Sequence, residues 1–316
     1  MTAVAGSVLV TGEALTDLVP VSGRSATYAA VPGGAPANVA VCLARIGVPV
    51  SFAGTLGGDA FAAAAEERLL GAGVDLSLCG RSPLPTALAL AGDGRHGADY
   101  VFHTDRTATF QPPPPLGGLD RFDAVYVGGL AAVVEPAADA VADAVRESSG
   151  TVLAVDPNVR RHRALDDRRT VERLRQLCGR ADLIKISDED AVGLWPGRDP
   201  AAVCRVLADS GPLVVLTRGA GGSTAFLPSG GEAEVRAVRV EVVNTIGAGD
   251  AFMAAMLAWL QAVGALGVIG PSDITCQQAR DMLTFGSRAA AAVCAGSDAD
   301  FAAAVATIDG DLGTWR

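Results

Sequence analysis

Short apolar runs alternate with amphipathic stretches along most of this chain, and this alternation limits the fold more than any other feature. The apolar runs are punctuated by Gly, Asp or Ser and occupy residues 7–12, 50–57, 123–130, 151–156, 181–187 and 212–219. The amphipathic stretches between them occupy residues 35–47, 58–72, 135–148, 168–179 and 199–210. Apolar strands separated by helices predict a doubly wound α/β fold, in which helices cover both faces of a mostly parallel sheet.

Polar residues end three of the predicted strands: Asp156, Ser187 and Thr217. Open α/β sheets bind their ligands beyond the carboxyl ends of the strands, so the site is expected at that edge. Two regions break the alternation. Residues 17–34 and 84–111 carry hairpin-like patterns, and we expect them to form a small antiparallel lid built from separate parts of the chain. With 316 residues, half of them hydrophobic, residues 1–316 are expected to form one domain with this appendage.

Composition excludes several classes of function. The net charge of −10 argues against nucleic acid as a partner, because phosphate-backbone binding needs clustered Lys and Arg. The six cysteines have no zinc-ligand spacing and are expected to be small hydrophobic residues, three of them in apolar helical runs. The N-terminus lacks the basic region of a signal peptide, and no run of about 18 apolar residues indicates a membrane span. We therefore expect a cytoplasmic protein with no membrane partner.

The stretch VVNTIGAGDAFMAAMLAWL, residues 242–260, places two glycines and a carboxylate at the start of an apolar helix. Unpaired N–H groups at a helix start form an anion site, and glycines there let an anion approach the backbone. Asp250 in the first helical turn is held ionised by the helix dipole. Phosphoryl transfer to a hydroxyl needs this pair: donors for the moving phosphoryl group and a base for the alcohol proton. An ordinary capped helix is an equally good interpretation of this turn taken alone.

Other glycine signatures do not fit. The chain has no GxxxxGK[ST] string, which excludes a P-loop enzyme. RGAGGST at 218–224 follows a strand, but Thr224 replaces the last glycine and the next element is predicted to be a strand. A dinucleotide fingerprint requires a helix there.

Six ordered strings give the chain a resemblance to the ribokinase/PfkB family of carbohydrate kinases over nearly its whole length, most closely to bacterial fructokinases. They are GEALTD (12–17), GGAPANVAVCLARIGVPVSFAGTLGGDAF (33–61), DPNVR (156–160), IKISDED (184–190), VVLTRGAGGS (214–223) and NTIGAGDAFMAAML (244–257). The resemblance implies a ribokinase-like fold and the use of ATP and Mg²⁺. Any one string alone is compatible with a turn or a helix start; the shared order favours the family.

The resemblance also implies roles for individual residues. Asp250 is the catalytic base, and the amides of Gly247, Ala248 and Gly249 form the anion hole. Sugar hydroxyls are bound by Asp17, Gly33, Gly34 and Asn38. Asn158 and Arg160 also belong to the substrate site, Arg160 as a phosphate contact. Nucleotide contacts are expected from Ser187, Thr217, Gly219 and Gly222.

Lys185 is the only lysine, although Lys and Arg together number 25. It lies between isoleucines in a predicted buried strand. A lysine kept where arginine is so available suggests that a compact ammonium group is needed, so we expect it at the nucleotide site. The alternative is a lysine pointing outward at a strand edge. His96, His103 and His162 match nothing catalytic and are expected on the surface or lid.

The chain departs from the family pattern at three places. Asn244 stands where Asp is usual, which implies a weakened monovalent-cation site and little potassium activation. Asp190 stands where the Asn-x-x-Glu motif has Glu, and its contribution to Mg²⁺ binding is expected to be indirect. Residues 290–301 lack the family's usual basic or proline residue, and the lid string FHTDRTATF is unlike that of fructokinases. These changes leave the sugar open.

The predicted function is ATP-dependent phosphorylation of a primary hydroxyl of a small sugar, with fructose as the first expectation. Ribose, a keto-deoxy sugar acid or a nucleoside are alternative acceptors, although GGAPAN at 33–38 differs from the GGKGAN of ribokinases. A sugar-binding protein that has lost turnover is the alternative from another class. A homodimer that shares the lid is also expected.

Overall fold

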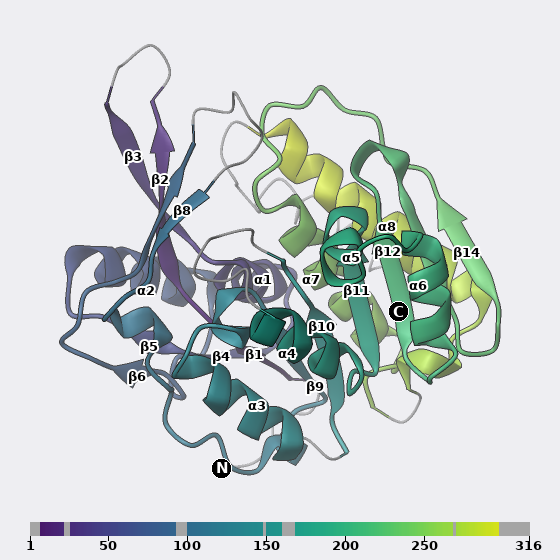
Figure 1. The fold of residues 1–316 in the computed structure, drawn as a ribbon, viewed down its shortest axis with the longest axis horizontal. Coiled ribbons are helices and arrows are strands. Elements are labelled where there is room, and N and C mark those ends of the chain that lie inside the picture. The colour runs from purple at the N-terminus through teal and green to yellow at the C-terminus, as the bar shows by residue number, and fades with distance from the viewer. Residues whose placement is uncertain are drawn as a thin grey trace.

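The computed structural model describes residues 7–21, 26–92, 100–147, 150–159, 168–267 and 270–296. An eight-stranded sheet forms its centre, with helices on both sides (Figure 1). The strand order is β14-β13-β12-β11-β10-β9-β1-β4, and only β13 and β14 pair antiparallel to their neighbours. The strands are β1 (Val8–Thr11), β4 (Val50–Ala53), β9 (Ala124–Gly128), β10 (Val152–Asp156), β11 (Leu183–Ser187), β12 (Leu213–Thr217), β13 (Ser223–Phe226) and β14 (Glu232–Val235). The predicted doubly wound, mostly parallel sheet is confirmed.

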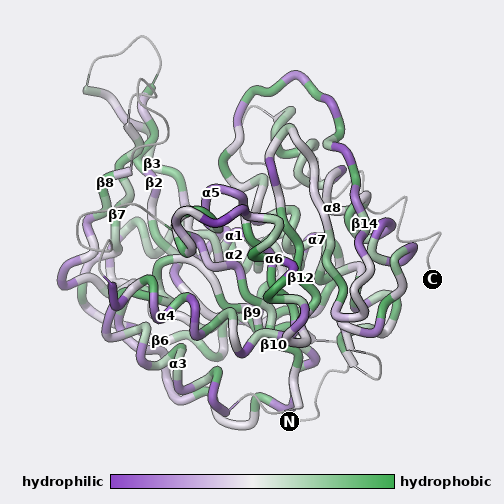
Figure 2. Tube along the Cα trace, turned by 45° about the vertical axis from the view of Figure 1, so that its right-hand side comes forward, coloured by the Kyte–Doolittle hydropathy of each residue, from purple (hydrophilic) through white to green (hydrophobic). Residues whose placement is uncertain are grey.

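Helices pack on both faces because successive strand residues point in opposite directions. In β1, Val8 and Val10 join one apolar core and Leu9 joins the other. The first core is covered by α1 (Ala35–Arg45), α2 (Ala60–Ala72), α7 (Ala248–Ala262) and α8 (Cys276–Ala295). The second is covered by α3 (Ala137–Glu147), α4 (Arg168–Cys178), α5 (Asp188–Leu194) and α6 (Pro200–Ala208). Figure 2 shows hydrophobic strands β9, β10 and β12 inside and mixed colouring on α3 and α4 outside.

Local signals explain where the helices begin. Asp59 caps α2 by accepting a bond from the amide of Ala62 at 2.9 Å, and Asp199 caps α6 in the same way from Ala202 at 2.8 Å. The predicted helices agree with the structure to within two residues at each end. The short α5 and the long α8 are findings of the structure that the sequence analysis did not predict. Thr275, which forms a capping box with Gln278, was an available signal for α8.

A second sheet of four strands lies beside the main sheet, at the upper left of Figure 1. It has the order β3-β2-β7-β8, with β2 (Leu15–Pro20), β3 (Tyr28–Gly33), β7 (Leu88–Ala91) and β8 (Tyr100–His103). The two predicted antiparallel hairpins are present, but β2 and β7 join them in parallel, so the lid sheet is mixed. Two shorter strands, β5 (Thr55–Leu56) and β6 (Gly80–Arg81), pair separately.

Three 3₁₀ turns lie between β8 and α3 in the chain: η1 (Ala108–Phe110), η2 (Leu119–Arg121) and η3 (Leu130–Ala132). Two more, η4 (Gly219–Gly221) and η5 (Pro271–Asp273), lie later in the chain. One face of the lid packs on a small apolar cluster that includes Leu15, Ala89, Phe110 and Leu130. Cys42, Cys178 and Cys204 are buried in α1, α4 and α6, as predicted, and burial raises the pKa of each thiol to about 12. No helix in the described part of the chain is long and apolar enough to cross a membrane.

Candidate active site

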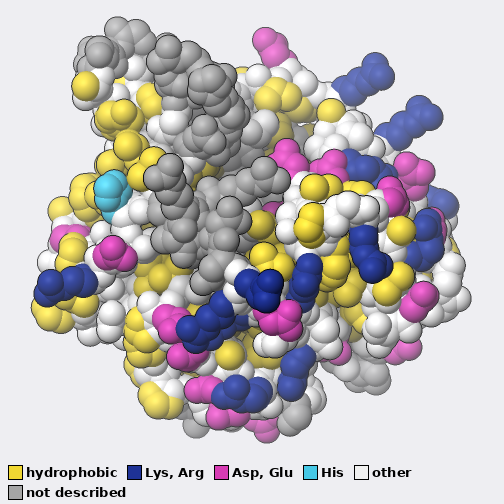
Figure 3. Space-filling view, viewed as in Figure 1, with side chains coloured by type: hydrophobic (Ala, Val, Ile, Leu, Met, Phe, Trp, Pro, Cys, Tyr) yellow, Lys and Arg dark blue, Asp and Glu magenta, His cyan; other side chains and the backbone are white. Residues whose placement is uncertain are grey.

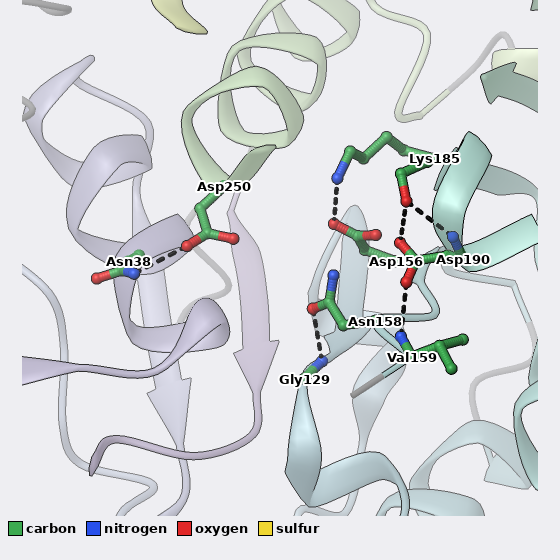
Figure 4. A network of polar contacts seen from close by, with 9 residues as sticks. Asn38, Gly129, Asp156, Asn158, Val159, Lys185, Asp190 and Asp250 are labelled. Carbon is green, nitrogen blue, oxygen red and sulfur yellow. Dashed lines mark hydrogen bonds and ion pairs between the residues drawn. The ribbon is translucent and has the colours of Figure 1, made fainter. Parts of the chain in front are cut away.

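The polar residues of the candidate site lie in two groups, which Figure 4 shows side by side. One group comes from the starts of α1 and α7, and the other from the carboxyl ends of β10 and β11 and the first turn of α5. This is the edge of the sheet that the sequence predicted. We call them the α7 group (Asn38 and Asp250) and the strand-end group (Asp156, Asn158, Lys185, Ser187 and Asp190).

The α7 group is built on a helix start. Gly247 is the N-cap of α7 and has φ 81°, a conformation that favours glycine. Asp250 lies in the first turn of the helix, as predicted, and residues Ala251–Leu260 behind it are all buried. The amide of Ala248 donates to the carbonyl of Thr245 at 3.2 Å. One of the three predicted anion-hole amides is therefore already bonded within the turn.

Asn38 orients the Asp250 carboxylate. Its Nδ2 donates to Oδ2 of Asp250 at 2.8 Å, and its own side chain is only 6% exposed on α1. A donated hydrogen bond stabilises the ionised form of a carboxylate. The carboxylate is thus held in place by a residue 212 positions away in the sequence.

Asp17 lies on β2 beside Gly33 on β3. A methyl group on Gly33 would lie 2.0 Å from Oδ2 of Asp17, so any side chain there would require the Asp17 carboxylate to move. Gly34 has φ 100° and lies against the backbone of Glu13. Both glycines therefore have a packing reason in addition to any contact with a ligand.

Arg68 of α2 is a member of this region that sequence reasoning missed. Its Nη1 donates to the carbonyl of Pro32 at 3.2 Å. Burial and the charge of Arg45 lower the pKa of Arg68, while the carboxylates of Asp250 and Asp17 oppose that shift. Arg68 directly follows Glu66 and Glu67 in α2, so its sequence context gave no signal that it belongs to this region.

The strand-end group is organised around Lys185. Its Nζ donates to Oδ2 of Asp156 at 2.7 Å, and the two side chains are 5% and 0% exposed. Burial by itself would lower the pKa of Lys185, but the charge of Asp156 and the hydrogen bond to it raise that pKa, so the ammonium stays charged. Burial raises the pKa of Asp156 to about 6 against the opposing charge of Lys185, so the pair is ionised at neutral pH. Lys185 is not at an outward-facing strand edge.

Lys185 also reaches the glycine turn at the start of α7. A methyl group placed on Gly249 would lie 3.1 Å from Nζ, so the ammonium is next to the glycine turn at the start of α7. Sequence reasoning predicted Lys185 for the site but did not assign its partner. A buried lysine requires a carboxylate, and Asp156 at the end of the neighbouring strand was the available signal.

Asp190 and Asn158 complete the strand-end group. Oδ1 of Asp190 accepts from the amide of Val159 at 2.8 Å, and Oδ2 accepts from Oγ of Ser187 at 2.5 Å. Oδ1 of Asn158 accepts from the amide of Gly129 at 3.2 Å (Figure 4). These bonds tie the segment after β10 to β11 and to the loop after β9. No cluster of three His, Cys, Asp or Glu residues suited to a metal ion occurs among the residues that the structure describes.

The predicted nucleotide residues continue along the same edge. Thr217 of β12 is paired in register with Ser187 of β11. Gly219, with φ 49°, begins the turn η4, and Gly222 has φ 87°. A methyl group on Gly222 would lie 2.2 Å from the carbonyl oxygen of Val235, so Gly222 allows β14 to approach.

Asn244 precedes the α7 turn. Its Oδ1 accepts from the amide of Ile246 at 3.0 Å, which uses the side chain to cap its own loop. The carbonyl of Cys294 accepts from the amides of Val243 and Asn244, which ties this loop to the end of α8. Arg160, His96 and His162 lie outside the described residues, and His103 is exposed on the lid at the end of β8.

Comparison with known proteins identifies the family of this chain. The model for pfkB family carbohydrate kinases matches residues 5–304. The chain belongs to this family.

A fructokinase of Rhizobium leguminosarum bv. trifolii is 32% identical over 268 residues, which cover 80% of this chain and 79% of that protein. A fructokinase of Klebsiella pneumoniae is 31% identical and covers 82% of this chain and 86% of its own length. Among solved structures, the fructokinase of Vibrio cholerae O395 in its fructose-, ADP- and calcium-bound form superposes with a TM-score of 0.81. It is 25% identical, with 97% of this chain and 99% of that chain covered.

Proposed function

We propose that this pfkB family kinase transfers the γ-phosphoryl group of ATP to a primary hydroxyl of a small ketose, with fructose as the first candidate. The observation that carries the proposal is the position of Asp250: its carboxylate is held by Asn38 in the first turn of α7, beside a glycine turn that Lys185 approaches. The fructokinase relatives support fructose as the acceptor.

The proposed chemistry is an in-line displacement. Asp250 takes the proton of the sugar hydroxyl while the oxygen of that hydroxyl bonds to the γ-phosphorus of ATP. The bond from the γ-phosphorus to the bridging oxygen breaks, and ADP leaves. Charge on the transferring group is stabilised by the free amides of the α7 turn and by the Lys185 ammonium. The amide of Ala248 would have to leave Thr245 to join them.

Asp17, Gly33, Gly34 and Asn38 are proposed to bind the sugar hydroxyls, with Asn158 opposite them. We propose that the lid closes over this sugar, which would exclude water from the phosphoryl donor. Hydrogen exchange would test the closure: the β2–β3 and β7–β8 hairpins should become protected in a fructose-saturated sample. Unchanged protection would remove closure from the proposal.

Ser187, Thr217, Gly219 and Gly222 are proposed to line the nucleotide site, and Arg160 is proposed to contact phosphate. The strand-end carboxylates fit a magnesium ion that is held mainly by ATP, because Mg²⁺ usually takes one or two carboxylates together with substrate phosphates. Oδ1 of Asp156 is buried and has no hydrogen-bond partner within the described ranges. Both oxygens of Asp190 already accept bonds, so Asp190 would act through water. When bound, the ion would neutralise phosphate charge.

The lid face also supports a homodimer. Tyr28 on β3 and Val101 on β8 lie on the same face of the lid sheet and are 45% and 49% exposed. In Figure 3, hydrophobic side chains gather at the upper left over these strands. A second copy of the lid would cover them. The proposal keeps the cytoplasmic location expected from the sequence, which cell fractionation would check.

A coupled assay of ADP release tests the function. The purified protein is supplied with ATP, Mg²⁺ and one acceptor at a time: fructose, ribose, a keto-deoxy sugar acid or a nucleoside. Fructose should give the highest kcat/KM. A higher value with another acceptor would replace fructose in the proposal, and no ADP release with any of them would contradict the kinase assignment. Calorimetry with fructose would then identify a binding protein without turnover.

A further inference from the structure

Glu13 is a buried carboxylate outside every group described above. It lies between the end of β1 at Thr11 and the start of β2 at Leu15, where the chain passes from the main sheet into the lid. Its side chain is only 2% exposed. Burying a carboxylate is costly unless hydrogen bonds replace its water, so its partners decide what it does.

The turn after β9 is built around this carboxylate. Oε1 accepts from the amide of Leu130 at 3.0 Å, and Oε2 accepts from the amide of Ala131 at 2.9 Å. Gly129 has φ 70° and ψ −161°, a region open in practice only to glycine. A methyl group on Gly129 would lie 2.2 Å from Oε1. The glycine therefore lets the turn bring two amides onto the carboxylate.

This turn leads to one side of the candidate site. The amide of Gly129 donates to Oδ1 of Asn158 at 3.2 Å. Leu130 and Ala131 pack with Leu15 in the apolar cluster beneath the lid. By holding this turn, Glu13 positions both Asn158 and the start of β2 at Leu15.

The backbone of Glu13 leads to the other side. A methyl group on Gly34 would lie 2.6 Å from the Glu13 carbonyl oxygen, so the start of α1 rests on this residue. The carbonyl of Gly34 accepts from the amide of Asn38 at 2.9 Å, and Asn38 holds Asp250. Glu13 is therefore in contact with both sides of the proposed sugar site.

We propose that Glu13 is a positioning residue of the sugar site: its carboxylate sets the distance between Asn158, on one side, and Asn38 and Asp17, on the other. This inference rests on the proposed function. The proposed nucleotide residues Ser187, Thr217 and Gly219 belong to β11, β12 and the turn after them, away from these contacts. Loss of the carboxylate should therefore affect the sugar more than ATP.

Glu13→Gln tests this with little change of shape. An amide side chain offers one acceptor oxygen and turns its NH₂ group toward the second backbone amide, which is left without a partner. We expect kcat/KM for fructose to fall by about 10-fold to 100-fold, since a misplacement of about 1 Å can cost that much. The KM for ATP should stay within about twofold, because the ATP-binding strand ends keep their contacts.

The matched control is Asp182→Asn. Asp182 also accepts a backbone amide, that of Leu153 at 2.8 Å, but it precedes β11 at the opposite edge of the sheet. The Asp182→Asn variant should have a lower Tm and an unchanged KM for both fructose and ATP. If Glu13→Gln behaves in the same way, or raises the KM for ATP as much as that for fructose, the inference is wrong. Should Glu13→Gln not fold, Glu13→Asp keeps the charge, shortens the reach and must still raise the KM for fructose selectively.

Hydrogen exchange separates this inference from the proposed function. Glu13→Gln should speed exchange in residues 129–134 and in β2, and leave β12 and α6 unchanged. Unchanged exchange in 129–134 and β2 would overturn the positioning role even in an active enzyme. Absence of ADP release from the unmutated protein with every acceptor would instead refute the proposed function, and the exchange experiment would still decide the role of Glu13.

Discussion

The main sheet and the lid sheet of this protein are buried to very different degrees. The strands of the main sheet lie between two layers of helices, so that Leu9 and Val10, which point to opposite faces, are both fully buried. The lid sheet has only one packed face, and apolar residues such as Tyr28 and Val101 remain exposed on it. Both sheets contribute residues to the candidate site.

The difference indicates a division of labour. Asp156 and Lys185 on the main sheet have buried partners, and Asp250 begins a helix that is buried behind it. Groups that must be placed accurately for chemistry are best carried by such rigid elements. Asp17 lies on the lid, whose fewer buried contacts favour local opening. We therefore expect changes on the main sheet to lower kcat and changes on the lid to affect binding or assembly.

Replacement of Asp250 is expected to have the largest effect. Asp250→Asn removes the proposed base but keeps a side chain that can bond to Asn38, so kcat should fall by about 10²-fold to 10⁴-fold while fructose binding survives. Steady-state kinetics and calorimetry measure the two quantities. Asp281→Asn is the control, since Asp281 is half-buried on α8 and bonds only to Gln277 among the contacts that the structure describes. Near-normal kcat in Asp250→Asn would exclude it as the base.

Lys185→Met tests the buried ion pair of the main sheet. The single change leaves the buried charge of Asp156 without its cation and should lower the free energy of unfolding by about 3–5 kcal/mol. Adding Asp156→Asn removes that charge, so the double variant should regain much of the lost stability. Its kcat should remain about 10²-fold to 10³-fold low if the ammonium stabilises the phosphoryl group. Thermal unfolding and kcat are measured for both variants; recovery of kcat in the double variant would reduce Lys185 to a structural role.

Asn244→Asp tests whether a cation binds at the loop before α7. The Asn244 oxygen caps the amide of Ile246, and an amide lacks the full charge that attracts a potassium-sized ion. We expect little activation of the unmutated enzyme by potassium and greater activation, of about a few-fold, in Asn244→Asp. Initial rates in potassium and in a bulky organic cation at constant ionic strength provide the measurement. Strong potassium activation of the unmutated enzyme would contradict the prediction.

A substitution on the exposed face of the lid should have the smallest effect on kcat. Val101→Asp places a charge where a second lid would pack, so it should shift the protein from dimer to monomer and leave kcat within about twofold. Val206→Asp is the matched control, because Val206 is 62% exposed on α6. Sedimentation of the three proteins decides the matter. A monomeric unmutated protein, or a dimer that survives Val101→Asp, would refute the shared lid.

Local patterns in the sequence predicted the main elements and part of the site. The runs at 151–156 and 181–187 became β10 and β11, and the glycine turn before Asp250 became the start of α7. Hydrophobic periodicity and capping act over a few residues, so they can be read without the fold. The α7 group could be expected only through a family resemblance, because Asn38 and Asp250 have no sequence pattern that links them.

By itself the sequence determined the parallel sheet, the two hairpins of the lid, and the helix start that carries Asp250. Only the tertiary structure decided that β2 pairs with β7, that Asp156 is the partner of Lys185, and that Glu13 holds the turn after β9. The first set depends on interactions between residues close in the chain, whereas the second joins groups 29 to 117 residues apart in its hydrogen bonds. Such pairings depend on how whole elements pack. A buried charged or polar group needs a hydrogen-bond partner, and the packing of the elements determines which partner is close enough.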